Sequence, residues 1–186
     1  MAPCSAIPGR AVSGQTVDAQ TELVTVIQDL QARLRRLEDT EAIRNLKSRY
    51  AQLCDRNYSP DQLANLFTED AVWDGAAFGV FRGREQIRAF FAGVSGQITW
   101  ALHYMAGPEI TINSDGETAS GCWYLFEPCT MTQRNNPGTE EPVLQMAKYE
   151  DSYRRVDGVW KFAHVKIEYE ALTNLYEGWV AQPFRP

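Results

Sequence analysis

The stretch EAIRNLKSRYAQLCD, residues 41–55, decides the fold because its apolar residues mark one buried face of an α-helix. These residues recur three or four positions apart, and they are Ile43, Leu46, Tyr50 and Leu53. The polar residues outside this face are Arg44, Lys47, Arg49 and Gln52. Asp55 ends the run, so its negative charge lies beside the negative end of the helix dipole. Because that placement is unfavourable, we interpret Asp55 as a carboxylate that serves a function.

The charge of the chain argues against binding to nucleic acids or anionic membranes. The 186 residues carry a formal net charge of -6, and the sequence pI is near 5.0. Both kinds of partner require a concentrated basic patch. No apolar stretch approaches the roughly 20 residues of a membrane span, and the N-terminus lacks the charged-then-apolar order of a signal peptide. We therefore expect a cytoplasmic protein with no nucleic-acid or membrane partner.

The cysteines give no sign of a metal site or a disulfide framework. They stand at Cys4, Cys54, Cys122 and Cys129, without a CxxC pair and without the spacing of a Cys/His metal site. The sequence also lacks a glycine-rich loop that would hold phosphates. We therefore expect free thiols, no metal site and no cofactor.

Composition divides the chain into four parts. Residues 1–17 are rich in Pro, Gly and Ser and lack a period, which predicts a disordered tail. A helical arm is predicted over residues 18–37, a single folded domain over 38–175, and a C-terminal tail over 176–186. The arm carries a short heptad seam formed by Leu23, Ile27, Leu30, Leu34 and Leu37. Such a seam could pair with another subunit or lie on its own domain, and two heptads are too few to decide.

Helices come first in the predicted domain and strands dominate afterwards. A helix start is indicated at Ser59-Pro60, where a cap residue precedes proline. Short strands are predicted over 71–75 and 79–83, followed by a helix over 84–92. The remaining stretches, 100–113, 117–131, 143–156 and 159–172, are long and rich in β-branched and aromatic residues. This order predicts an α+β domain with its helices on one side of a curved antiparallel sheet.

Two polar residues lie on strand faces that are otherwise apolar. Alternation places Glu127 on one face with Trp123 and Leu125, and His103 on one face with Met105 in the middle of a strand. Glu127 could instead face water at the end of its strand, because glutamate is rarely buried unpaired. His103 could equally be a core histidine with satisfied hydrogen bonds. For the second histidine, His164, we favour a structural role.

A pairing of His103 with Asp55 would give the first histidine a chemical use. A buried imidazole needs a partner for its second nitrogen, and a carboxylate at a helix end can supply it. A histidine held by a carboxylate has a fixed tautomer and a stabilised imidazolium, so it can act as a general base. Tyr50 could assist from its hydroxyl, or it could be a core tyrosine with one hydrogen bond.

The order of elements over residues 37–172 resembles the SnoaL-like branch of the NTF2-like superfamily. DTEAIRNLKSRYAQLCD resembles the first helix of the bile-acid 7α-dehydratases, and HYMAGPEITINSDGETASGCWYLFE resembles their central hairpin. The family's tyrosine and aspartate, five positions apart, fall on Tyr50 and Asp55, its histidine on His103, and a further aspartate on Glu127. A later arginine of that family falls near Tyr169, which is a departure from its pattern.

Two other enzyme families share this pattern. EDAVW and DSYRRVDGVWKF resemble the hexachlorocyclohexane dehydrochlorinases, whose pocket tryptophan matches Trp73 and whose histidine and aspartate match His103 and Asp55. Their arginine has no counterpart, because Val165 stands there. The scytalone dehydratases are more distant relatives.

The resemblance implies a cone of helices on a bent sheet around one deep pocket, and a cofactor-free lyase. In the resulting hypothesis His103, held by Asp55, removes a proton from carbon, and Tyr50 and Glu127 assist a departing hydroxyl. The expected pocket lining is Trp73, Phe78, Met105, Trp123, Leu125 and Tyr169. This lining predicts a hydrophobic ring substrate such as a steroid, terpenoid or polyketide.

Two alternatives remain open at the level of sequence. The same fold could carry an isomerase or cyclase, in which the base returns the proton elsewhere and nothing leaves. The chain could also be a non-catalytic assembly subunit, such as the small subunit of a ring-hydroxylating dioxygenase. Relatives of this kind are commonly trimers or dimers, so we expect a homo-oligomer.

Overall fold

The computed structural model describes residues 13–133 and 135–185. The chain divides into two compact units, Met1–Glu38 and Asp39–Pro186, and each is described by itself. Of the tail predicted over residues 1–17, residues 1–12 lie outside the described residues. The remainder of that prediction is wrong, because helix α1 (Ser13–Asp55) begins within it.

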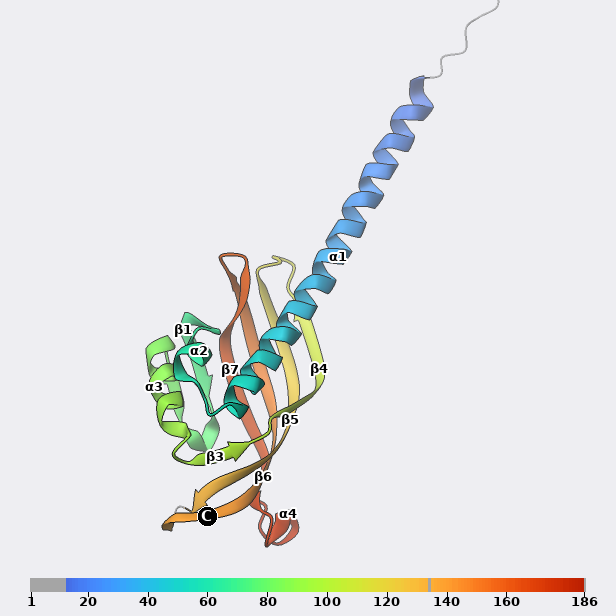
Figure 1. Ribbon diagram of the computed structural model, residues 1–186. Helices are drawn as coiled ribbons and strands as arrows, with labels where there is room; N and C mark the ends of the chain where they lie inside the picture. Colours follow the sequence, from blue (N-terminus) through green and yellow to red (C-terminus); the bar gives the residue numbers. More distant parts are fainter. Residues whose placement is uncertain (1–12, 134, 186) are drawn as a thin grey trace, which may run out of the picture. The chain divides into compact units, whose positions relative to one another are not determined.

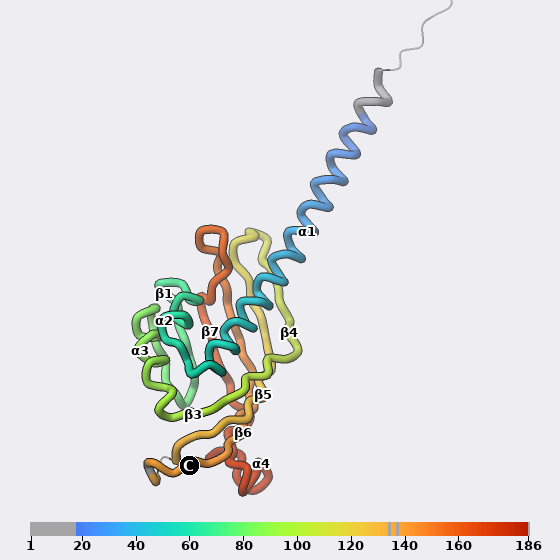
Figure 2. The backbone as a smooth tube through the Cα atoms, in the orientation of Figure 1, coloured from blue at the N-terminus to red at the C-terminus, as the bar shows by residue number. Residues whose placement is uncertain are grey.

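Helix α1 is one continuous helix that includes both the predicted arm, residues 18–37, and the stretch 41–55, which the sequence patterns describe as two segments (Figures 1 and 2). In the first unit the seam residues Leu23, Ile27, Leu30, Leu34 and Leu37 are all exposed, between 45% and 69%. None of the helices formed by the described residues combines the length and apolar character that crossing a bilayer requires. Pairing of the seam with another subunit stays a prediction.

The second unit is built on a curved sheet of seven strands, and its order is β2-β1-β7-β6-β5-β3 with β4 also paired to β5. The strands are β1 (Phe67–Asp74), β2 (Val80–Arg82), β3 (Ile98–Ala101), β4 (Tyr104–Ile112), β5 (Thr118–Gln133), β6 (Asn136–Val156) and β7 (Val159–Asn174). All pairings are antiparallel except that between β1 and β7. The remaining elements are α2 (Pro60–Ala64), η1 (Ala76–Phe78), α3 (Arg84–Val94) and α4 (Gly178–Ala181). The predicted α+β class is confirmed.

The buried faces follow the periods read from the sequence. The helical stripe Ile43, Leu46, Tyr50 and Leu53 is buried, as are alternate residues of β5 from Ala119 to Cys129. Figure 1 shows α2 and α3 beside β1 and β7, with the C-terminal part of α1 crossing the same side of the sheet. Removing these apolar surfaces from water supplies the main driving force for folding.

One residue outside the predicted helical stripe is nevertheless fully buried. Lys47 has no exposed surface, and its Nζ lies 2.8 Å from Asp151 Oδ2 and 3.3 Å from the centroid of the Tyr149 ring. The Tyr153 hydroxyl also donates to Asp151 Oδ2, at 2.8 Å, and accepts from Trp123 Nε1, at 3.0 Å. Lys47 can be buried because a carboxylate and an aromatic face replace its hydration.

The C-terminal segment predicted as a tail packs on the sheet instead. Helix α4 lies within it, and beyond this helix Phe184 forms a parallel bridge with Leu172 of β7. Arg185 is 7% exposed, and its Nη2 lies 2.6 Å from Glu141 Oε1. The buried ion pair and the bridge to β7 attach this segment to the sheet.

We predict that Lys47→Met destabilises the protein by about 3–5 kcal/mol, because it leaves the buried Asp151 charge without its partner. The double variant Lys47→Met/Asp151→Asn should recover part of that loss. Urea unfolding with an unchanged m value measures both. The matched control is Lys166→Met, whose ion pairs with Glu150 and Glu168 are exposed, so its effect should stay within about 1 kcal/mol. Equal losses in the single and double variants would contradict this account.

Candidate active site

The site forms where the C-terminal end of α1 meets a break in the edge of the sheet. His103 was predicted in the middle of a strand, and that prediction is wrong, because it lies between β3 and β4, which end at Ala101 and begin at Tyr104. Both strands pair with β5. The break frees the backbone N–H of His103, which donates to Asp55 Oδ1 at 2.9 Å.

The expected contact between His103 and Asp55 is present. His103 Nδ1 lies 2.8 Å from the same Asp55 Oδ1 that accepts the backbone bond. A carboxylate can only accept, so Nδ1 carries the hydrogen and Nε2 is left as the basic nitrogen of the neutral ring. The side chain of His103 is 6% exposed and that of Asp55 is 24% exposed. The pair is therefore largely removed from water on the histidine side.

A second carboxylate stands on the other side of the imidazole. Glu127 Oε2 lies 3.4 Å from His103 Nε2, and Glu127 Oε1 accepts a 2.9 Å hydrogen bond from Gln145 Nε2. Glu127 is 2% exposed, which rules out the alternative that it faces water at the end of its strand. The imidazole thus lies between two carboxylates that contact different nitrogens.

Burial and charge act in opposite directions on these groups. Burial lowers the pKa of His103, but the charge of Glu127 and the hydrogen bond to Asp55 outweigh it, so the pKa stands above its usual value. Burial raises the pKa of Glu127 to about 7, although the nearby His103 opposes the shift. The two groups therefore titrate as one coupled pair.

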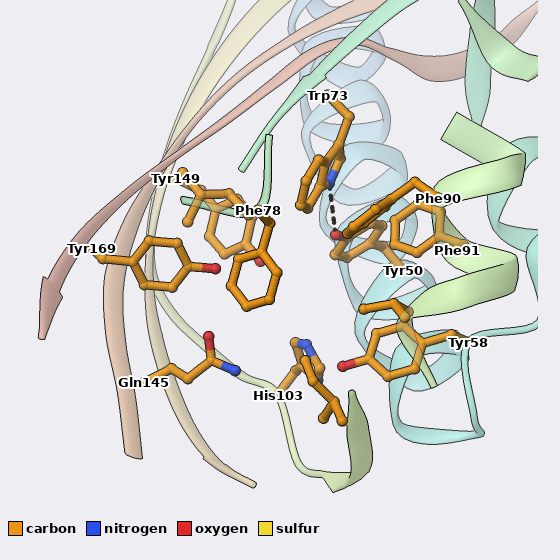
Figure 3. A pocket seen from close by; sticks show the side chains of 13 residues that line it. Tyr50, Tyr58, Trp73, Phe78, Phe90, Phe91, His103, Gln145, Tyr149 and Tyr169 are labelled. Atoms are coloured by element: carbon orange, nitrogen blue, oxygen red, sulfur yellow. Dashed lines mark hydrogen bonds between the residues drawn. The ribbon is translucent and has the colours of Figure 1, made fainter. Parts of the chain in front are cut away.

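A cavity opens next to His103 and is walled mainly by aromatic rings (Figure 3). Its empty volume is about 320 Å³ when all space not filled by atoms is counted, including space open to solvent. The lining residues are Tyr50, Tyr58, Trp73, Phe78, Phe90, Phe91, Val94, Ile98, His103, Gln145, Tyr149, Ile167 and Tyr169. Besides the indole N–H of Trp73, six of these residues carry a polar group and the rest of the wall is apolar, a combination that suits a small ligand with a hydrophobic ring and a few polar atoms.

The cavity brings together only part of the predicted site. Tyr50, Trp73, Phe78, His103 and Tyr169 line it. The Tyr50 hydroxyl accepts a 3.1 Å hydrogen bond from Trp73 Nε1 (Figure 3). Burial raises the pKa of Tyr50 well above its usual value, so it stays protonated. Asp55 and Glu127 are not among the lining residues and reach the cavity through His103.

Three residues predicted in the lining lie elsewhere. Trp123 and Leu125 are 5% and 3% exposed and belong to the hydrophobic core, where Trp123 donates to Tyr153. Met105 is partly buried and packs against that core. Alternation along β4 and β5 identifies the face on which a residue lies but not which strands border the cavity. Trp123 and Leu125 pair with Tyr149 and Ala147 of β6, and among the described residues the cavity wall includes residues of β6 and β7 but none of β5.

Sequence reasoning missed three lining residues that carry a polar group, Tyr58, Gln145 and Tyr149. Gln145 had a readable signal, because it alternates with Val143, Ala147 and Tyr149, which are all buried. Tyr58 had none, since it follows α1 in a turn where no period applies. Among the described residues, no group of three or more His, Cys, Asp or Glu side chains is placed to hold a metal ion.

Comparisons with known proteins place this architecture in a family. Three solved structures share the fold. A protein of Novosphingobium aromaticivorans provisionally named an aromatic ring hydroxylase is 26% identical, with a TM-score of 0.65 over 76% of this chain and 96% of its own. A type 2 hexachlorocyclohexane dehydrochlorinase is 23% identical, with a TM-score of 0.68 over 77% and 93%. A protein of the same Novosphingobium species provisionally named a scytalone dehydratase is 21% identical, with a TM-score of 0.66 over 75% and 89%.

The family model is the more direct comparison, because it matches the sequence itself. The model for the SnoaL-like domain matches residues 35–166, which include both carboxylates, His103 and most of the cavity wall. The chain therefore belongs to the SnoaL-like domain family of the NTF2-like superfamily.

Proposed function

We propose that the protein is a cofactor-independent lyase that eliminates water from a hydrophobic ring compound. The observation that carries the proposal is the 2.8 Å contact between His103 and Asp55 at the wall of an open, aromatic cavity. A general base must be oriented, partly desolvated and within reach of a bound ligand. His103 meets each of these conditions.

The reaction uses His103 as both base and acid. With Nδ1–H held by Asp55, the Nε2 lone pair takes a proton from a substrate carbon next to an activating group. The electron pair of that C–H bond forms the new double bond, and the bond from the neighbouring carbon to the hydroxyl oxygen breaks. The imidazolium returns its proton to the departing hydroxide, so water and the unsaturated product leave. One acid–base group of this kind contributes roughly 10²- to 10⁴-fold.

Glu127 supports this cycle from beside Nε2, the nitrogen that takes the proton. We expected it to assist the leaving hydroxyl directly, but it does not line the cavity and contacts His103 and Gln145 instead. Its charge favours the imidazolium, which forms when the carbon proton is taken. Glu127 is therefore a positioning residue that adjusts the basicity of His103.

The cavity limits the size of the substrate. The empty volume of about 320 Å³ includes space open to solvent, so it is an upper limit on the part of a ligand that the cavity can enclose. Among steroids, terpenoids and polyketides, we therefore propose compounds with one or two rings. The names of two structural neighbours, a dehydrochlorinase and a dehydratase, denote elimination reactions and support the same class.

A second candidate is a non-catalytic subunit of a ring-hydroxylating enzyme. The likeness to the protein provisionally named an aromatic ring hydroxylase favours it. In that role the cavity residues would be dispensable, and replacing His103 would leave the activity of the assembled enzyme unchanged.

We predict that His103→Ala and Asp55→Asn each lower the rate of water loss by at least about 10²-fold. The assay offers a panel of hydroxylated one- and two-ring ketones and terpenoids and follows the products by mass spectrometry. His164→Ala, which changes the other histidine of the chain, is the matched control because His164 does not line the cavity. Near wild-type turnover by His103→Ala would remove it as the base, and a product of unchanged mass would indicate an isomerase.

We predict that Glu127→Gln changes the pH dependence of stability. The pKa of Glu127 is about 7 in the folded protein against an ordinary value of 4.5, so the folded state holds this proton more tightly. The free energy of unfolding of the wild type therefore falls as the pH rises from 4.5 to 7, by about 3 kcal/mol from this group. The raised pKa of His103 acts in the same direction above its usual value of 6.5.

The variant should remove most of this fall. Urea unfolding of both proteins between pH 4 and pH 8 measures the difference, which should be small at pH 4 and favour Glu127→Gln at pH 8. Glu150→Gln, an exposed glutamate on β6, is the control and should follow the wild type. A constant difference between Glu127→Gln and wild type at every pH would show that Glu127 is not a buried titrating group.

A further inference from the structure

Two buried polar atoms at the cavity have no hydrogen-bond partner among the described residues. They are the Tyr58 hydroxyl oxygen and Gln145 Oε1, and both residues line the cavity. Figure 3 shows the Tyr58 hydroxyl directed toward the space beside His103, and the Gln145 oxygen directed into the same cavity from the opposite wall. Buried polar groups in folded proteins nearly always have a partner, so each of these atoms calls for an explanation.

The backbone at Tyr58 adopts an unfavourable conformation that places the side chain at the cavity. Asn57 and Tyr58 both have positive φ, 66° and 53°, directly after the end of α1. Asparagine tolerates this left-handed region, but a bulky aromatic residue rarely adopts it. The ring then stacks on Phe91, with centroids 6.3 Å apart, and meets the His103 ring edge-on at 6.1 Å. Strained residues cluster at functional sites, where the surrounding structure holds them in place.

The orientation of Gln145 is fixed by its amide nitrogen. Nε2 donates to Glu127 Oε1 at 2.9 Å and contacts Cys129 Sγ at 3.4 Å. Glu127 Oε1 remains an acceptor when the carboxylate is ionised or carries its proton on Oε2, beside His103 Nε2, and a flipped amide would then place two acceptor oxygens against each other. Oε1 is therefore left to accept a hydrogen bond from the cavity side.

We propose that Tyr58 and Gln145 form a donor–acceptor pair that recognises two oxygens of the ligand. Tyr58 donates to a carbonyl oxygen, and Gln145 Oε1 accepts from a hydroxyl group on the same ring compound. The inference rests on the proposed function for the statement that this ligand is a substrate, but not for the statement that it binds. It makes Tyr58 a further catalytic residue and Gln145 a specificity-determining one.

Tyr58 acts in the reaction as a hydrogen-bond donor and keeps its proton. Burial raises the pKa of Tyr58 well above its usual value. When His103 takes a proton from the carbon next to the carbonyl, negative charge develops on the carbonyl oxygen. A fixed donor in a dry site stabilises that charge more than it stabilises the uncharged ketone.

The test is binding of simple probes to the full chain by titration calorimetry. The probes are 3- and 4-hydroxyacetophenone, which carry a carbonyl and a hydroxyl, and their methoxy ethers, which keep the carbonyl and lose the donor. For at least one isomer, the wild type should bind the hydroxyl compound about tenfold more tightly than its ether, because the ether leaves Gln145 Oε1 unpaired. Absence of this preference for both isomers would overturn the proposal.

The variants separate the two contacts. Gln145→Met, which keeps the length of the side chain, should abolish the preference for the hydroxyl compound. Tyr58→Phe should weaken both members of a pair about tenfold and leave their ratio unchanged. Tyr104→Phe and Gln52→Met are exposed controls for the same chemical changes and should match the wild type. Wild-type affinities for Tyr58→Phe, or a persisting preference in Gln145→Met, would overturn the corresponding contact.

The experiments test the ligand contacts of Tyr58 and Gln145 separately from the proposed lyase reaction. His103→Ala should retain the preference for the hydroxyl compound, because His103 contributes no bond to either oxygen. A retained preference with no elimination from any substrate would support the donor–acceptor pair and reject the lyase. Elimination that depends on His103 but is unaffected by Tyr58→Phe and Gln145→Met would reject the pair and leave the lyase in place.

Discussion

The carboxylate of Asp55 at the end of α1 is the constraint on which the site depends. A negative charge at the C-terminal end of a helix is unfavourable, and here one oxygen, Oδ1, accepts from both the backbone and the ring of His103, at 2.9 and 2.8 Å. These two bonds offset the unfavourable placement only because β3 and β4 are interrupted at His103. The helix end and the strand break therefore meet at one contact, which also fixes the tautomer of the imidazole.

Burial then determines how the remaining polar groups are arranged. Glu127 is almost fully buried, so its charge must be shared with His103 or neutralised by a proton, and its pKa of about 7 places it between these states. Its other oxygen is bonded by Gln145, which fixes that amide. Lys47 and Asp151 follow the same rule next to the Tyr149 ring, where each compensates the charge of its partner. Each of these ionisable groups in the interior is thus held by a specific neighbour.

The sequence predicts well which face of a helix or strand is buried, but it predicts poorly whether a buried residue lies in the core or at the cavity. Periods of 3.6 and 2 correctly identify the buried stripe of α1 and the inward side of Glu127, because burial along an element repeats with its geometry. They cannot tell Trp123 and Leu125, in the core, from Gln145, at the cavity, because long-range packing decides which strands of the curved sheet border the cavity. Lys47 was assigned to a polar face because a charge is normally exposed. Only the distant Asp151 and Tyr149 make its burial favourable, and no local pattern reveals them.

Tyr58 shows why the chemistry of such a site cannot be predicted from local sequence patterns. Its backbone conformation is unfavourable for the residue, its hydroxyl is buried with no partner among the described residues, and neither feature benefits the free protein. A fold selected only for stability would remove both, for example with glycine in the turn. The strained backbone and the unpaired hydroxyl of Tyr58 occur together beside the oriented His103. Across the cavity, Gln145 Oε1 is also buried without a partner among the described residues. This arrangement is expected if a ligand supplies the missing hydrogen bonds. Binding would then be strongest for the molecule whose oxygens match both atoms, because any other ligand leaves one of them buried and unpaired.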